Sequence, residues 1–286
     1  TIKGLNPGMR SNIDVNGIND LLGPGGGSKL VARNAEAAIK VETGMKGVKI
    51  MNLMVSGGTE AKNIGIHFVG ATDNGMLSNI IGINLHTGVK IEQAKNMQIV
   101  NCWVCELPNS IELIGGENIV VKNCQLGAQP TGITCKVQEV NKLSFINNQV
   151  YPDGRENLVL DACNNCVIEG NNFKSYYNGI LVLNGNDNTV NKNIFWLTGA
   201  VQNQLLDHGD DFGIINVKGN NNMVASNSLS CEWAYAGAVT VNAVQGTGNV
   251  FKNCFVDNLE SYRVFLVNAQ TEVSNCVSSD KVSIVE

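Results

Sequence analysis

The chain has 286 residues, a formal net charge of −5 and only 16% charged side chains. This acidic balance argues against nucleic acid or an anionic membrane surface as a partner, because both attract basic proteins. The sequence contains no apolar run long enough to span a membrane and no recognisable signal peptide. We expect residues 1–286 to form one domain with a large core.

Short runs of alternating apolar residues recur along the chain at steps of 22 to 25 residues, with one step of 34. Such strands are too short and too regular for a doubly wound sheet, and no useful amphipathic helix lies between them. A parallel β-helix, in which each coil stacks on the next, explains both facts. The runs are Gly88–Ile91, Ser110–Leu113, Gly132–Cys135, Asn157–Leu160, Gly179–Val182, Gly213–Asn216, Ala238–Val241 and Arg263–Leu266.

A second series of strand-like segments carries a recurrent Asn. We expect this Asn to be an inward turn residue, because Asn tolerates the left-handed conformation and its amide can bond to the Asn of the next coil. The positions are Asn101, Asn123, Asn147, Asn171, Asn193, Asn227, Asn253 and Asn275.

Nine cysteines raise the question of disulfides or metal. Cys102/Cys105 and Cys163/Cys166 have CxxC spacing, but no paired CxxC or His cluster completes a zinc site. We interpret the cysteines as small buried hydrophobes and expect no zinc site. Free thiols favour a reducing compartment, such as the bacterial cytoplasm, but only weakly. A secreted and a cytoplasmic bacterial location therefore both stay open.

The two least regular parts of the sequence lie outside the repeat. No helical cap is visible at the start, so we expect either a preceding segment or a neighbouring chain to cover that end. The Gly-rich run at 23–28 lacks the Lys-Ser/Thr of a phosphate-binding loop. An insert at Leu197–Asp211 contains Asp207, His208, Asp210 and Asp211, which form either a binding loop or an ordinary solvated loop.

Glu112 is the first candidate for chemistry. Alternation places it opposite Ile111 and Leu113, so it points outward if those two point into the core. Its equivalents on the following coils are expected to be Thr134 and Val159, with Asp161 slightly further along. A carboxylate on a strand face is usually only solvated.

Glycosidic chemistry normally needs a second carboxyl group. The candidates are Glu106, Asp161 and the pair Asp210/Asp211, the last if a neighbouring subunit brings them close. Arg155 could orient a polyol or a carboxylate. Aromatic residues of a solenoid usually pack the core or the coil edges, but some could stack on a sugar: Tyr176, Tyr177, Trp103, Trp196 and Trp233.

Several segments resemble, in order, the inulin fructotransferases and the related difructose anhydride hydrolases. They are CELPNSIEL at Cys105–Leu113, YPDGR at Tyr151–Arg155, GNNFKSYYNG at Gly170–Gly179 and DDFGIINVKGNNNMVASN at Asp210–Asn227. The resemblance covers most of the chain from about residue 45. It implies a right-handed parallel β-helix, a homotrimer with active sites at subunit interfaces, and no metal or organic cofactor. The substrate that it implies is a fructan, a fructo-oligosaccharide or a difructose anhydride.

The resemblance places the family's catalytic Glu on Glu112 and its catalytic Asp on Asn101. An amide is neither a base nor a nucleophile at neutral pH, so we expect fructotransferase turnover to be severely reduced. Asn101 is either a natural replacement or an Asp→Asn change made to trap a substrate.

Two other interpretations stay open. One is a non-catalytic glycan-binding or structural β-helix. The other is a pectate-type lyase, which would need a calcium site of clustered carboxylates, and only Asp207–Asp211 comes near that.

Overall fold

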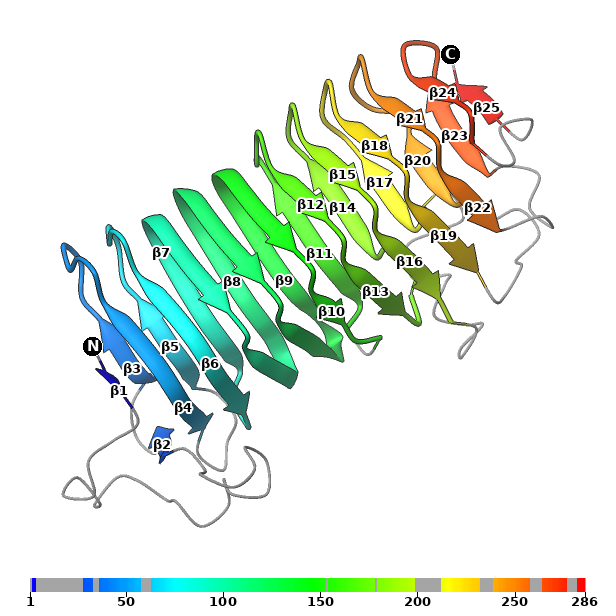
Figure 1. The fold of residues 1–286 in the computed structure, drawn as a ribbon. Coiled ribbons are helices and arrows are strands. Elements are labelled where there is room, and N and C mark those ends of the chain that lie inside the picture. Colours follow the sequence, from blue (N-terminus) through cyan, green and yellow to red (C-terminus); the bar gives the residue numbers. More distant parts are fainter. Residues whose placement is uncertain are drawn as a thin grey trace.

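The computed structural model describes residues 2–3, 28–32, 36–57, 63–152, 154–177, 179–198, 212–231, 239–257, 264–276 and 282–285. All regular structure within these ranges is β-strand, and the strand pairs run parallel. The strands stack coil on coil into an elongated solenoid, with β3 and β4 near one end and β23 to β25 at the other (Figure 1). The predicted parallel β-helix is confirmed.

Each central coil has three strand segments, which we call the A, B and C faces in chain order. The A face contains β3 (Ala37–Val41), β5 (Ile64–Phe68), β11 (Glu156–Asp161), β14 (Leu181–Asn184), β17 (Ile215–Val217), β20 (Val241–Ala243), β23 (Phe265–Asn268) and β25 (Val282–Val285). The B face contains β1 (Ile2–Lys3), β12 (Val167–Glu169), β15 (Thr189–Asn191), β18 (Met223–Ala225), β21 (Val250–Lys252) and β24 (Glu272–Ser274). The C face contains β2 (Ser28–Ala32), β10 (Gln149–Val150), β13 (Asn172–Ser175), β16 (Ile194–Leu197), β19 (Ser228–Cys231) and β22 (Phe255–Asp257).

Five longer strands run through more than one face without a break. β4 (Lys49–Gly57) and β6 (Met76–Ile83) form B and then C segments, and β7 (Thr87–Val100) forms A and then B. β8 (Trp103–Lys122) and β9 (Gln125–Ile146) each pass through C, A and B. The three faces together enclose the core.

Alternation along the A face decides which side chains enter the core. In β8, Ile111 and Leu113 are almost fully buried, while Glu112 between them points outward. Ile111 pairs in register with Val89 on one side and Cys135 on the other, so inward side chains stack directly on one another. The first series of sequence repeats is thereby identified as the A face.

The turn between the B and C faces holds one residue per coil in the left-handed conformation, with φ of 56° at Asn101. Asn is common there because it adopts this conformation at little cost. The equivalent residues are Asn52, Asn79, Asn123, Asn147, Gly170, Lys192, Ser226, Asn253 and Asn275.

The buried Asn ladder occupies the position after this turn residue. Asn148, Asn171, Asn193 and Asn227 are at most 2% exposed. The Oδ1 of each accepts a bond from the backbone N–H of its counterpart on the preceding coil, at 2.8–2.9 Å for Asn171, Asn193 and Asn227. The predicted ladder therefore mixed two adjacent positions. Asn101 is an exposed turn residue and does not belong to the internal ladder.

A second buried ladder follows the turn between the A and B faces. Asn188, Asn222 and Asn249 are each 1% exposed, and every Nδ2 also donates to a backbone carbonyl of the preceding coil. Full hydrogen bonding makes these buried amides stabilising, because an unpaired one would be costly.

On four coils the residue after the B–C turn is a cysteine instead of Asn: Cys102, Cys124, Cys254 and Cys276. Eight cysteines are free and buried, which confirms their interpretation as small hydrophobes for those eight. Burial raises the pKa of Cys163 to about 11 and that of Cys166 to about 12, so both thiols stay protonated at neutral pH. Cys231 has no described side chain.

The ladder yields a stability prediction. Asn171→Ala removes the acceptor of the Asn148 backbone N–H and the donor to Phe145 O, leaving buried groups unpaired. We expect a loss of about 3 kcal/mol in the free energy of unfolding, measured by urea denaturation. Asn147→Gly is the control, since Gly also accepts the left-handed φ of 53° there, and should cost no more than about 1 kcal/mol. Equal losses in both variants would contradict the ladder account.

Candidate functional site

The outer surface of the A face carries a column of polar side chains in register. Lys90, Glu112 and Lys136 occupy equivalent positions on three successive coils. The expected equivalence of Glu112 with Thr134 is wrong by two residues, because the corner before β9's A segment is longer. Val159 then follows Lys136, as expected for that coil. Glu112 is therefore flanked by a cation on either side.

Glu112 is partly shielded, with 20% of its side chain exposed. Its Oε1 lies 3.9 Å from the Nζ of Lys136, which is a loose ion pair. Since the strand fixes the direction of the side chain, Glu112 presents a carboxylate to any ligand lying along the outer A face. Such a group can accept or donate a proton or orient hydroxyl groups.

A second charged group lies one coil earlier on the same face. Glu92 Oε1 is 3.0 Å from Lys90 Nζ and 3.3 Å from His67 Nε2. Burial alone would raise the pKa of Glu92, but the hydrogen bonds from Lys90 and His67 outweigh it, and the pKa lies below its ordinary 4.5. Glu92 is thus held as a carboxylate that orders Lys90 beside Glu112.

Asp161 lies on the same outer face, two coils beyond Glu112 and two residues further along its strand. Its Oδ1 accepts a bond of 2.7 Å from Asn184 Nδ2. Two strand spacings place it roughly 10 Å along the axis from Glu112. Asp161 could contact the same extended ligand, but the two residues do not form a close carboxyl pair.

The corner between the C and A faces holds a further group of the predicted residues. Glu106 is exposed with φ of 62°, and Arg155 is partly exposed. Tyr176 is half-buried at the same corner of the next coil, where its N donates to Pro152 O. Tyr177 is only 5% exposed, so it packs the corner and offers no stacking surface. Asp207, His208, Asp210, Asp211 and Trp233 lie outside the described residues.

The remaining aromatic candidates lie on the outer C face. Trp103 packs beside Met54 and Ile81. The Nζ of Lys174 lies over the ring of Trp196, 4.7 Å from the ring centre, which is a cation–π contact. Both are therefore engaged in packing away from the A face.

Asn101 lies on the same coil as Glu112 but far from it across the coil. Asn101 forms the turn between the B and C faces, and the whole C segment of β8 separates it from Glu112. This turn is the vertex opposite the A face, so the buried core lies between the two side chains. One chain does not bring Asn101 and Glu112 together.

Glu156 is a further candidate that the sequence pattern does not identify. It begins β11 at the C–A corner, with 16% of its side chain exposed and Oε1 3.9 Å from Arg155 Nε. Burial raises its pKa above the ordinary 4.5, and the Arg155 charge only partly offsets this. A carboxyl with a raised pKa is a candidate proton donor. Nothing in the sequence pattern reveals burial at a corner.

The described residues contain no cluster of three His, Cys, Asp or Glu side chains able to hold a metal ion. Among the same residues, no helix is long and apolar enough to cross a membrane.

The fold defines the chain as a parallel β-solenoid with a column of outward polar side chains on its A face. Residues 131–284, a little over half the chain, match the family model "Right handed beta helix region". The chain therefore belongs to the right-handed β-helix family. Comparison with curated protein sequences finds no match.

Solved structures share this fold. DFA-IIIase from Arthrobacter chlorophenolicus A6 in complex with GF2 is 21% identical, with a TM-score of 0.74, over 91% of this chain and 73% of that one. The same enzyme without its lid is 20% identical, with a TM-score of 0.75, over 99% and 79%. GH136 lacto-N-biosidase from Eubacterium ramulus is more distant. It is 10% identical, with a TM-score of 0.54, over 87% of this chain and 49% of that one. The first two belong to the enzyme group that the sequence motifs resemble.

Glu156 provides a pH prediction. Because its folded pKa is raised, the folded chain holds this proton more tightly than the unfolded chain, and its contribution to stability falls as the pH rises through 4.5 and the higher folded value. Glu156→Gln removes this loss, so the variant should gain stability over the parent as the pH rises through that window. Urea unfolding at a series of pH values measures it; a pH-independent difference would contradict the assignment.

Proposed function

We propose that the protein is a fructan-directed enzyme of the inulin fructotransferase and difructose anhydride hydrolase type, with Glu112 as its general acid/base. The observation that carries this proposal is the placement of Glu112, outward and partly shielded, between Lys90 and Lys136 on the A face. Support from outside the chain is the shared fold with DFA-IIIases, whose structures hold GF2 and DFA-III.

The chemistry follows from what a positioned carboxyl can do. As a carboxylate beside Lys136, Glu112 would accept the proton of an attacking hydroxyl, which is a fructose hydroxyl in transfer and water in hydrolysis. A second carboxyl would protonate the departing glycosidic oxygen or stabilise the anomeric carbon. The position that the resemblance gives to this second group holds an amide at Asn101, which can do neither.

The distance across the coil supports a site shared between copies of the chain. If the Asn101 position and Glu112 act on one substrate, they must come from different copies, because the core separates them within one chain. We propose a homotrimer in which the B–C turn of one copy approaches the A face of another. The residues that would support substrate or interface are Arg155, Glu106, Asp161, Tyr176, Asp210 and Asp211, whereas the buried Tyr177 would act only by packing the corner.

The direct test compares the parent chain with Asn101→Asp on inulin and on difructose anhydride. The turn tolerates Asp, which also adopts the left-handed conformation. We expect products only from the variant, resolved by chromatography. Consumption of inulin would indicate transfer, and consumption of difructose anhydride would indicate hydrolysis. Full activity in the parent would contradict the role of this position and direct attention to Glu106 or Asp161.

Glu112→Gln, made in the Asn101→Asp background, should reduce turnover at least about 100-fold, because the proton transfer is lost. Glu117→Gln is the matched control: Glu117 lies on the same strand, paired with Lys142 at 2.7 Å, but at the corner between the A and B faces. It should keep its activity. Unchanged turnover in Glu112→Gln would exclude Glu112 as acid/base.

The amide at Asn101 specifically favours a second candidate, a glycan-binding β-helix without turnover. That alternative predicts measurable oligosaccharide binding by the parent and no product from either chain. It replaces the enzymatic proposal if Asn101→Asp folds normally, binds the oligosaccharide and yields no product.

A further inference from the structure

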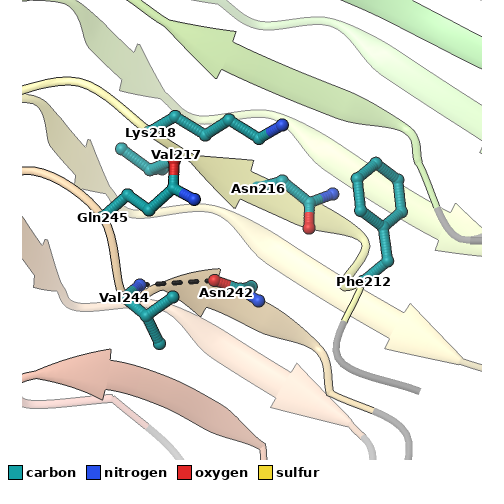
Figure 2. A pocket seen from close by; sticks show the side chains of 7 residues that line it. All are labelled: Phe212, Asn216, Val217, Lys218, Asn242, Val244 and Gln245. Atoms are coloured by element: carbon teal, nitrogen blue, oxygen red, sulfur yellow. Dashed lines mark hydrogen bonds between the residues drawn. The ribbon is translucent and has the colours of Figure 1, made fainter. Parts of the chain in front are cut away.

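The outer A face has a hollow between β17 and β20, several coils away from Glu112 (Figure 2). Its volume is about 220 Å³. At ~30 Å³ per water molecule, this is room for about seven waters. The space is enough for one sugar ring, and its open side lets the rest of a longer ligand extend over the surface.

The floor of the hollow carries two carboxamides in register. Asn216 of β17 pairs with Asn242 of β20. Asn216 is 2% exposed, and its amide is fixed by the backbone of Gly213, whose N donates to Oδ1 at 2.8 Å and whose O accepts from Nδ2 at 2.7 Å. Asn242 Oδ1 accepts from Val244 N at 3.3 Å. Such amides are oriented before any ligand arrives, which lowers the cost of binding.

The sides of the hollow combine an aromatic ring with flexible polar groups. Figure 2 shows Phe212 at one side of Asn216, with Lys218 and Gln245 toward the other. Among the described residues, no carboxylate lines the hollow, and Lys218 makes no ion pair. Amide donors and acceptors beside an aromatic face match a sugar, whose hydroxyls hydrogen-bond and whose C–H face is apolar.

We propose that this hollow binds one neutral sugar unit and serves as a subsite on the same wall as Glu112. The register runs from Glu112 through Lys136, Val159 and Val182 to Asn216, which is four strand spacings or roughly 19 Å. An oligosaccharide lying across the A-face strands would reach both places. The identity of the sugar as a fructosyl unit rests on the proposed function, whereas binding in the hollow does not require Glu112.

Titration calorimetry of the full chain with a neutral fructo-oligosaccharide, and separately with a galacturonate oligosaccharide, tests the assignment. Gln245→Ala should weaken neutral binding about fivefold through lost hydrogen bonds, and Phe212→Ala about tenfold through the lost ring face. Gln270→Ala is the control, since Gln270 is exposed and does not line the hollow. Gln245 is exposed, so its truncation should leave the fold intact.

The outcomes separate this inference from the proposed function. Loss of binding in Gln245→Ala and Phe212→Ala, with Gln270→Ala unchanged, supports the subsite even if Asn101→Asp yields no product. Binding that is undisturbed by both variants, or absent altogether, overturns it. Preference for the galacturonate ligand, abolished by Lys218→Gln, overturns the neutral-sugar assignment.

Discussion

The structure depends on the parallel register of successive coils, which buried Asn carboxamides hold in place. Each ladder Asn accepts a backbone N–H from the preceding coil and donates to one of its carbonyls, as Asn171 does with Asn148 and Phe145. A shift of one residue would break every such bond and turn the apolar side chains outward. Register is therefore the constraint from which both the core and the outer wall follow.

Fixed register also decides how function can be arranged. Side chains on one outer face form straight columns at one strand spacing per coil, so Lys90, Glu112 and Lys136 are neighbours, and the Asn216–Asn242 hollow lies on the same wall. Residues half a coil apart, such as Asn101 and Glu112, are held on opposite sides of the core. A rigid solenoid offers extended surfaces readily, and it can unite opposite sides only through a second molecule.

The sequence was sufficient for the fold because the A-face strands repeat with buried residues at fixed intervals. It was less reliable wherever a corner changes length. The two extra residues before Lys136 displaced the expected equivalent of Glu112 to Thr134. The predicted Asn series mixed the exposed turn position with the buried ladder position, because Gly170, Lys192 and Ser226 replace Asn at the turn of three coils. Glu156 and the hollow depend on burial and on neighbouring coils, which no local pattern records.

The most direct test of a site built from two copies is complementation in mixed oligomers. A chain carrying both Asn101→Asp and Glu112→Gln is co-expressed with the unaltered chain, and products from inulin and difructose anhydride are measured, with the Asn101→Asp single variant as positive control. The account predicts activity in the mixture and none in either chain alone, because only mixed interfaces join the new carboxylate to an intact Glu112. An inactive mixture beside an active single variant would contradict it and place the whole site within one chain.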